Sequence, residues 1–199
     1  MITKNNSALT PGFNHEQGVA IWLTGLSGAG KTTISIPLVE KLREMGYRVQ
    51  LLDGDVVRQK LTKDLGFTKE DRDKNIERVT FVAEMLVKHG TIAVCAFISP
   101  YREERQYARS EIGRFIEVYV ECPLEVCEER DVKGLYKLAR AGEIKNFTGI
   151  DDPYEPPESA EIVVNTSKQT LEEEVNTIVE YLINKCYIKQ NKDKAPVYS

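Results

Sequence analysis

The stretch from Leu51 to Leu61 reads LLDGDVVRQKL and places two carboxylates next to a cation. Asp53 and Asp55 are separated by one glycine, and Arg58 follows three residues later. One carboxylate of such a pair can accept the proton of an attacking hydroxyl group, while the other orients the shell of a Mg²⁺ ion. Aspartates around a glycine are also common in simple turns, so the neighbouring sequence must decide between these two interpretations.

A complete phosphate-loop pattern, GxxxxGK[ST], lies upstream of the two aspartates. It follows an apolar run and precedes a helical pattern, which is the context expected of a P-loop. Its residues are Gly25, Leu26, Ser27, Gly28, Ala29, Gly30, Lys31 and Thr32, followed by Thr33. Backbone N–H groups and the helix N-terminus of such a loop bind phosphates. We expect Lys31 to reach the β- and γ-phosphates of a nucleotide and Thr32 to bind Mg²⁺.

The loop does not name a reaction, because kinases, GTPases, motor ATPases and non-catalytic switches all contain it. A GTPase would need a guanine-reading NKxD motif, and the sequence has none. The DVKG segment at residues 131–134 matches the DxxG pattern but does not follow a central strand. The acceptor side of the site must therefore decide the activity.

The segment from residue 58 to residue 75 supplies groups for an anionic acceptor. Its candidate site residues are Arg58, Phe67, Arg72 and Asn75. Two guanidinium groups can hold an anion, and the aromatic ring offers a face to a base, so we expect a nucleotide-like acceptor. The alternative is that both arginines are surface helix residues paired with Asp64 or Asp71, and their spacing leaves both interpretations open.

The elements that must position these groups alternate between strands and helices. Five short apolar runs predict buried strands at residues 19–23, 49–52, 91–98, 115–120 and 161–164. Helical patterns occupy residues 32–45, 76–90 and 171–182, the last after a Thr170/Glu173 capping box. This order predicts an α/β fold, a three-layer, doubly wound, mostly parallel sheet of the P-loop kinase type. Ligands then bind at the carboxyl ends of the strands.

Residues 130–149 reverse the charge of an otherwise acidic chain. This segment holds five basic and two acidic residues, a local net charge of +3. A solvated basic helix would explain that pattern. Next to a nucleotide site, a basic lid that covers the phosphates would explain it as well.

Length and composition limit the remaining possibilities. With 199 residues and 22.6 kDa, we expect one domain over residues 1–199. Its core is at about 18–185, its lid at about 130–155, and its flexible ends at 1–17 and 189–199. A net charge of −4 gives no general attraction to nucleic acid or to an anionic membrane, so neither is expected as a partner.

The chain is expected to be soluble and cytoplasmic. The longest apolar run, residues 92–98, is too short to cross a membrane, and residues 1–17 are too polar for a secretory signal. The four cysteines form no CxxC pair, so neither a zinc site nor a disulfide framework is expected. Cys95 and Cys122 lie in apolar runs and are predicted to be core residues.

Several motifs in order resemble the adenylyl-sulfate kinase (APS kinase) family. They are GLSGAGKTT, LDGDVVR, LGFTKEDRDKNIERV, FISPYREER, ERDVKGLYKLARAGEIKNFTGIDDPYEPP and VVNT, and the similarity runs from about Gly18 to Leu182. The resemblance implies that ATP, as co-substrate with Mg²⁺, phosphorylates the 3′-hydroxyl of adenosine 5′-phosphosulfate. The products would be 3′-phosphoadenosine 5′-phosphosulfate and ADP, and the enzyme would be a homodimer.

The resemblance also implies roles for individual residues. Asp55 is similar to the family's acidic residue near the acceptor hydroxyl. Arg58, Arg72 and Asn75 resemble the groups that hold the phosphosulfate, and Phe67 and Phe147 resemble the pair that encloses the acceptor adenine. Further acceptor contacts are implied for Ile98, Ser99, Lys133, Gly134 and Leu135, and donor contacts for Arg130 and Thr166. From their positions we expect Asp55 and Lys31 to be catalytic, and Thr32 with Asp53, through water, to hold the metal.

The chain departs from the family pattern at two places. Val56 stands where the family more often has asparagine, and a short connection, RSEIGRF, leads to the next strand. Two alternatives remain open. One is a P-loop kinase acting on a nucleoside monophosphate or a small polyol; the other is a nucleotide-binding regulator without catalysis.

Overall fold

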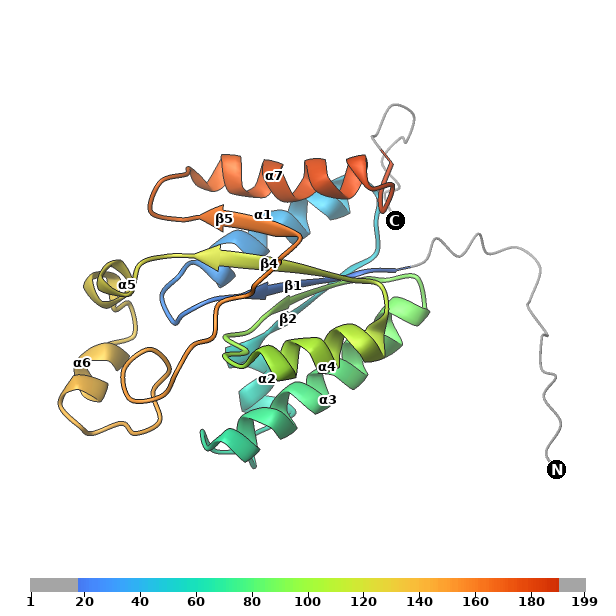
Figure 1. Cartoon of the computed structure of the whole chain (residues 1–199). Coiled ribbons are helices and arrows are strands. Elements are labelled where there is room, and N and C mark those ends of the chain that lie inside the picture. The colour runs from blue at the N-terminus through green and yellow to red at the C-terminus, as the bar shows by residue number, and fades with distance from the viewer. Residues whose placement is uncertain (1–17, 190–199) are drawn as a thin grey trace, which may run out of the picture.

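The computed structural model describes residues 18–189, so the expected flexible ends lie outside the described residues apart from residue 189. Five parallel strands form one sheet in the order β2-β3-β1-β4-β5 (Figure 1). Their bounds are β1 Ala20–Thr24, β2 Val49–Asp53, β3 Ile92–Ala96, β4 Phe115–Glu121 and β5 Ile162–Asn165. The predicted α/β sheet is confirmed, and it is parallel throughout. No helix within residues 18–189 is both long and apolar enough to cross a membrane.

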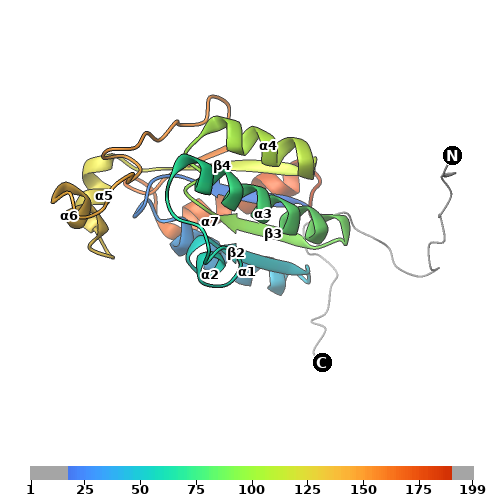
Figure 2. The same cartoon turned by 90° about the horizontal axis from the view of Figure 1, so that it is seen from below.

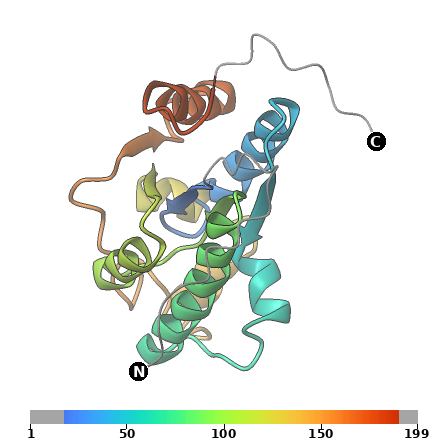
Figure 3. The same cartoon turned by 90° about the vertical axis from the view of Figure 1, so that its right-hand side faces the viewer.

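Helices cover both faces of the sheet because both faces are apolar. Along β1, Ile21 and Leu23 point into one core, while Ala20 and Trp22 point into the other. Helices α1 (Lys31–Glu44) and α7 (Leu171–Asn184) lie over the first core, and α3 (Lys69–Lys88) and α4 (Arg102–Ile112) over the second (Figure 3). Seen from below, α3 and α4 lie side by side (Figure 2).

The predicted strands and three predicted helices are all present, but the run at residues 91–98 is shorter than expected. It ends as a strand at Ala96, because the chain turns at Ser99, which has a φ of 39°. Within residues 18–189, four further helices were not predicted, namely α2 (Gly54–Lys60), α4, α5 (Leu124–Arg130) and α6 (Leu135–Arg140). Cys95 and Cys122 are buried, as predicted.

A buried ion pair fixes α4 to the sheet. The Arg105 side chain on α4 donates to Glu117 of β4 at 2.7 Å. Its remaining nitrogens donate to the Ser99 carbonyl at 2.6 Å and to the Glu155 carbonyl at 2.7 Å. With every part of the guanidinium group hydrogen-bonded, the cost of burying the charge is offset. Arg105 therefore joins three chain segments that are far apart in the sequence.

The capping box of α7 supports a stability prediction. The Thr170 hydroxyl accepts from the Glu173 N–H at 3.3 Å, and the Glu173 carboxylate accepts from the Thr170 N–H at 2.8 Å. Thr170→Ala should lower the free energy of unfolding by about 1 kcal/mol, the usual effect of losing a cap, measured by urea denaturation. Glu180→Ala, at an exposed site on the same helix, is the control and should cause no comparable loss. Equal losses in both variants would contradict the capping role.

Candidate active site

A cleft of ≈ 980 Å³ opens at the carboxyl ends of the strands. The crossover from β1 leads to β2 on one side of the sheet, and the crossover from β3 leads to β4 on the other. The two connections diverge at this edge, where open α/β sheets bind ligands. The cleft is lined by the phosphate loop, the ends of β2 and β3, the first turns of α2 and α3, and the segment around α6. We call residues 130–155 the lid segment; it lies at the left of Figure 1, beyond the strand ends.

The phosphate loop needs glycine at its two ends. Gly25 has a φ of 153°, and a Cβ there would lie 2.5 Å from the Val120 carbonyl oxygen. Gly30 has a φ of 103° and is followed at once by the first residue of α1. Side chains at these positions would be strained or would clash, so the loop conformation depends on glycine. The N-terminus of α1 thereby faces the cleft.

Lys31 is half-buried and lies within the loop. Its Nζ donates to the carbonyl oxygens of Gly25 at 2.8 Å and Leu26 at 2.7 Å. Burial lowers the pKa of Lys31 to about 8, only partly opposed by attraction to Cys127, Asp55 and Asp53. A bound polyphosphate would stabilise the ammonium form of Lys31, because a nearby anion favours the charged form of a lysine.

Asp53 connects the phosphate loop to the acceptor side. Its Oδ1 accepts from the N–H groups of Asp55 at 3.0 Å and Val56 at 3.4 Å, which caps α2. Its Oδ2 accepts from the Thr32 hydroxyl at 2.9 Å. A hydroxyl and a carboxylate at this spacing are the hard oxygen donors that Mg²⁺ prefers, so the two residues fit a magnesium site.

Asp55 lies in the first turn of α2, directly after the end of β2, and its carboxylate is exposed to the cleft. Lys133 of the lid segment forms an ion pair with it. The pair joins residues 78 positions apart and is exposed on both sides. Both residues line the cleft, and no sequence signal indicates that they touch each other.

Arg58 and Arg72 both point toward Phe67. The guanidinium carbon of Arg58 lies 4.4 Å from the ring centroid of Phe67, and that of Arg72 lies 5.9 Å from it. Neither arginine pairs with Asp64 or Asp71: Asp64 instead accepts two hydrogen bonds from Arg78 at 2.7 Å each. The surface-pair alternative is therefore wrong. Arg72 is buried and forms an ion pair with Asp152 at 3.7 Å.

Asn75, Ile98 and Ser99 line the floor of the same cleft. The buried Asn75 amide oxygen accepts from the Thr62 hydroxyl at 2.8 Å, which leaves its NH₂ group for the cleft. Ser99 has a positive φ of 39°, unusual for a residue with a side chain. The Trp22 N–H donates to its hydroxyl at 3.0 Å, and Arg105 holds its carbonyl, so the surroundings stabilise this strained conformation.

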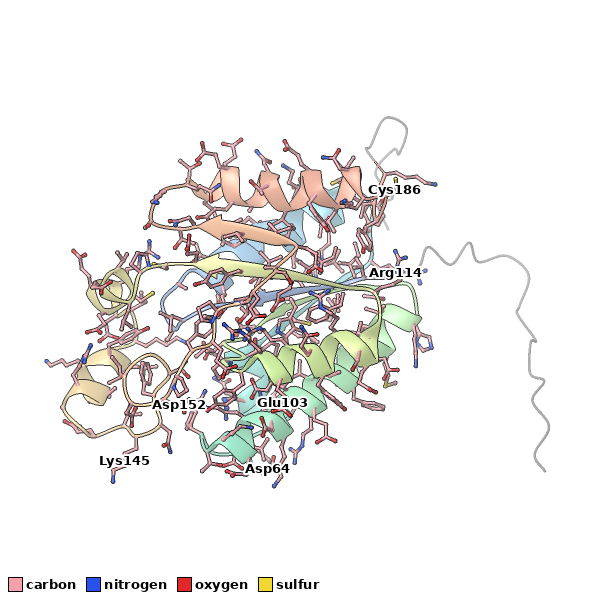
Figure 4. The ribbon with its side chains drawn as sticks, viewed as in Figure 1. Asp64, Glu103, Arg114, Lys145, Asp152 and Cys186 are labelled. Carbon is pink, nitrogen blue, oxygen red and sulfur yellow. The ribbon has the colours of Figure 1, made fainter. Side chains whose placement is uncertain are left out.

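The lid segment is not a solvated basic helix. Tyr136 is buried, and its hydroxyl donates to the Ser27 carbonyl of the phosphate loop at 2.9 Å. Arg130 donates to the Thr166 carbonyl at 2.8 Å and to the Gly28 carbonyl at 3.3 Å. The segment therefore contacts the donor side through these residues and the acceptor side through Lys133. Some of its charge does extend into solvent, as Lys145 does in Figure 4.

Some of the remaining predicted residues line the cleft and others do not. Leu135 and Phe147 line it, and the Phe147 ring packs edge-on against Tyr136 at 5.0 Å between centroids. Thr166 lines it as well, and its hydroxyl donates to the Ala29 carbonyl at 2.9 Å. Four predicted residues do not line it, namely Gly25, Leu26, Ala29 and Gly134. Val56 is 52% exposed and also lies outside the lining, so the exchange at this position removes no contact from the cleft.

The sequence analysis placed residues 150–155 in the lid but gave no role to single residues of the loop at 150–158, which contacts the sheet and the helices behind it. Asp152 accepts from the Tyr101 hydroxyl at 2.9 Å and pairs with Arg72; Figure 4 labels it on the loop beyond α6. The Tyr154 and Thr24 hydroxyls are 3.0 Å apart. The proline-rich motif in this loop could have indicated a rigid connection, but no sequence signal indicates which partners it meets.

Two further residues were missed because they resemble ordinary helix and loop positions. Glu104 and Thr148 both line the cleft and are 4% and 2% exposed. The Glu104 Oε1 and the Thr148 Oγ1 are buried atoms without a hydrogen-bond partner. Buried polar atoms are normally paired, so these two call for an explanation.

Comparison with known proteins agrees with this geometry. Residues 17–165 match the family model described as adenylylsulphate kinase. An adenylyl-sulfate kinase of Halothermothrix orenii is 60% identical over 91% of this chain and 98% of its own length. The solved structure of the Mycobacterium tuberculosis APS kinase CysC in complex with AMPPNP and APS has a TM-score of 0.80 and 39% identity. It covers 83% of this chain and 98% of its own chain. A hexameric APS kinase from Thiobacillus denitrificans has a TM-score of 0.68 and 36% identity; the match spans 88% of this chain and 30% of that one.

The lowered pKa of Lys31 leads to a prediction about proton uptake. With a pKa of about 8, Lys31 loses its proton in the range from pH 8 to pH 9 before a nucleotide binds, and the polyphosphate raises the pKa of the bound ammonium group. Mg-ATP binding should therefore take up a proton, up to about one per site, between pH 8 and pH 9. At pH 6.5 Lys31 is already charged, so this contribution should vanish. Calorimetry in buffers of different ionisation enthalpy measures the uptake, and an uptake independent of pH would contradict this role for Lys31.

Proposed function

The chain belongs to the adenylyl-sulfate kinase family and phosphorylates adenylyl sulfate with ATP, and we propose that Asp55 is the base of this transfer. The reaction moves the γ-phosphoryl group of ATP to the 3′-hydroxyl of adenylyl sulfate and yields 3′-phosphoadenylyl sulfate and ADP. The need for ATP supports a cytoplasmic location.

The convergence of three groups in one cleft is the observation that supports this assignment. The phosphate loop, the Asp55 carboxylate and the two guanidinium groups around Phe67 all line the same space. Phosphoryl transfer requires the donor phosphate, the attacking hydroxyl and the charge-neutralising groups to be held together, with little covalent chemistry by the protein. A carboxylate that lies next to both the donor groups and the acceptor groups is well placed to act as the base.

On the donor side, the loop N–H groups and Lys31 bind the β- and γ-phosphates. Lys31 exchanges its two carbonyl acceptors for phosphate oxygens, where its charge offsets charge that develops in the transition state. Arg130 and Thr166 border the phosphate loop and contact the donor from its outer side. Thr32 and Asp53 are the residues that would hold Mg²⁺, which when bound neutralises charge on the phosphate oxygens.

On the acceptor side, Arg58, Arg72 and Asn75 hold the phosphosulfate, and Phe67 and Phe147 enclose the adenine. Phe67 is 55% exposed, which leaves its free face open to a planar base. Asp55 accepts the proton of the 3′-hydroxyl as that oxygen attacks phosphorus. Lys133, which pairs with Asp55, then neutralises negative charge on the phosphorylated acceptor. The lid segment excludes water that would otherwise hydrolyse ATP.

Replacing Asp55 tests this assignment. Asp55→Asn keeps the size and the helix position but removes the proton acceptor, so kcat should fall by roughly 10²- to 10⁴-fold. Mg-ATP affinity should change little, because the donor is held by the loop. Steady-state kinetics of 3′-phosphoadenylyl sulfate formation and a separate ATP titration measure both quantities.

Asp64→Asn is the matched control, since it removes one carboxylate that lies outside the cleft. It should keep kcat within about twofold of the parent, as surface changes usually do. A parallel loss of ATP affinity in Asp55→Asn would instead assign Asp55 to the metal or to the fold.

For the oligomer, we propose a homodimer that uses the outer face of α3 and α4. Phe81 and Met85 are one helical turn apart on α3 and are 61% and 48% exposed, and Tyr107 of α4 is 41% exposed. The two helices that carry these residues pack side by side. The three apolar side chains therefore form one patch, of the kind that interfaces bury.

Disrupting this patch should separate the subunits. A Phe81→Glu/Met85→Glu double variant places two charges in the apolar contact, so its mass by light scattering should be near 22.6 kDa, half that of the dimer. Val163→Glu is the matched control, since Val163 is a comparably exposed residue on the edge strand β5. It should leave the mass unchanged. A double variant that stays a dimer would place the interface elsewhere.

A further inference from the structure

Glu104 lies at the floor of the acceptor half of the cleft and has an unusual environment. It stands in the first turn of α4, is 4% exposed and lines the cleft together with Asn75 and Ser99. Its Oε2 accepts from the Tyr101 N–H at 3.4 Å, and its Oε1 is buried without a partner. Capping the helix needs one oxygen only, and a glutamine would supply it without burying an ionisable group. The carboxyl group is therefore unexplained by the fold.

Charged groups from the packed elements surround this carboxyl. Burial has the largest effect and, together with Asp73 of α3, raises the pKa of Glu104 to about 7, while the Tyr101 N–H and Arg72 of α3 oppose the rise. Lys69, also on α3, pairs with Asp73 at 3.0 Å and lies 5.2 Å from the Tyr101 ring centroid. From the lid segment, Asp152 pairs with Arg72. Glu104 and Asp73 thus both lie near Arg72, the arginine proposed to hold the acceptor anion.

Negative charge at an anion site weakens the binding of every anion, but it also discriminates between anions of different charge. A sulfate ester end carries a single charge, whereas a terminal phosphate carries about −1.5 to −2 at pH 7. Arg58 and Arg72 attract both. A carboxylate behind them repels the second charge more strongly than the first, which is how a site can reject a close analogue.

We propose that Glu104, supported by Asp73, is a specificity-determining residue that favours the sulfate end of adenylyl sulfate over the terminal phosphate of ADP. The inference rests on the proposed acceptor site and adds the reason why that site accepts sulfate and rejects phosphate. Both acceptors have the same adenosine and the same 3′-hydroxyl, so the difference is confined to the anion. Selection grows as Glu104 ionises and is weakest in acid.

The test compares two acceptors with one donor. The full chain receives excess Mg-ATP with either adenylyl sulfate or ADP, and chromatography measures the 3′-phosphorylated product of each at pH 6 and pH 8.5. The ratio of the two kcat/KM values is the readout, because changes in the donor site or in the amount of folded enzyme cancel in it. For the parent, the ratio should favour adenylyl sulfate and rise with pH.

Glu104→Gln should lower the ratio at pH 8.5 by roughly tenfold, mainly through better use of ADP. The ionisation of ADP itself still contributes to the pH dependence, so the part attributed to Glu104 is the difference between parent and variant. Glu103→Gln is the matched control: it removes the same charge from the exposed neighbour, labelled at the start of α4 in Figure 4, and should leave the ratio unchanged.

If Glu104→Gln does not fold, as judged by circular dichroism, Asp73→Asn decides the question. Asp73 is partly exposed, and its removal should lower the ratio in the same direction but less. A ratio that stays at the parent value in the folded variant overturns the inference. Failure of the parent to phosphorylate adenylyl sulfate would instead overturn the proposed function, so the two failures can be told apart.

Discussion

The Asp53 carboxylate is the constraint that joins the two halves of the site. One oxygen caps α2 and so fixes the direction in which Asp55 points, and the other accepts from Thr32 at the start of α1. Donor and acceptor elements therefore share one rigid group at the end of β2. Because a helix cap and a hydroxyl hydrogen bond each tolerate little displacement, a shift of one half is transmitted to the other. The geometry of transfer depends on this link more than on any single substrate contact.

Charge is the second condition that the structure must satisfy. The chain carries a net charge of −4, yet both substrates are polyanions. The solution is local: Lys31, the two arginines at Phe67 and the basic lid segment face one cleft, while acidic groups lie behind or beside them. Several of the cations are already paired, Lys133 with Asp55 and Arg72 with Asp152. When a substrate replaces these partners, the net electrostatic gain from binding is smaller, but the specificity for the substrate is greater.

The sequence was sufficient for the parts that depend on local patterns. Apolar periodicity predicted all five strands, and the GxxxxGK[ST] spacing predicted the loop, because its glycines at residues 25 and 30 follow from backbone sterics alone. The helices α2, α5 and α6 have only six or seven residues, too few for a periodic signal. The contact of Lys133 with Asp55 and of Arg72 with Asp152 joins positions about 80 residues apart, and only the folded chain brings them together.

The lid segment couples the two substrates because it contacts both halves of the cleft at once. Tyr136 and Arg130 hold the carbonyl oxygens of the phosphate loop, whereas Lys133 holds Asp55 and the Asn146 carbonyl accepts from Arg72 at 2.6 Å. The segment therefore provides a contiguous set of contacts between the donor side and the acceptor side. By linkage, any coupling that passes through it changes the affinities of both substrates by the same factor. The buried ion pair of Arg105 and Glu117, with the hydrogen bond from Arg105 to the Glu155 carbonyl, holds the far end of this segment against α4 and β4.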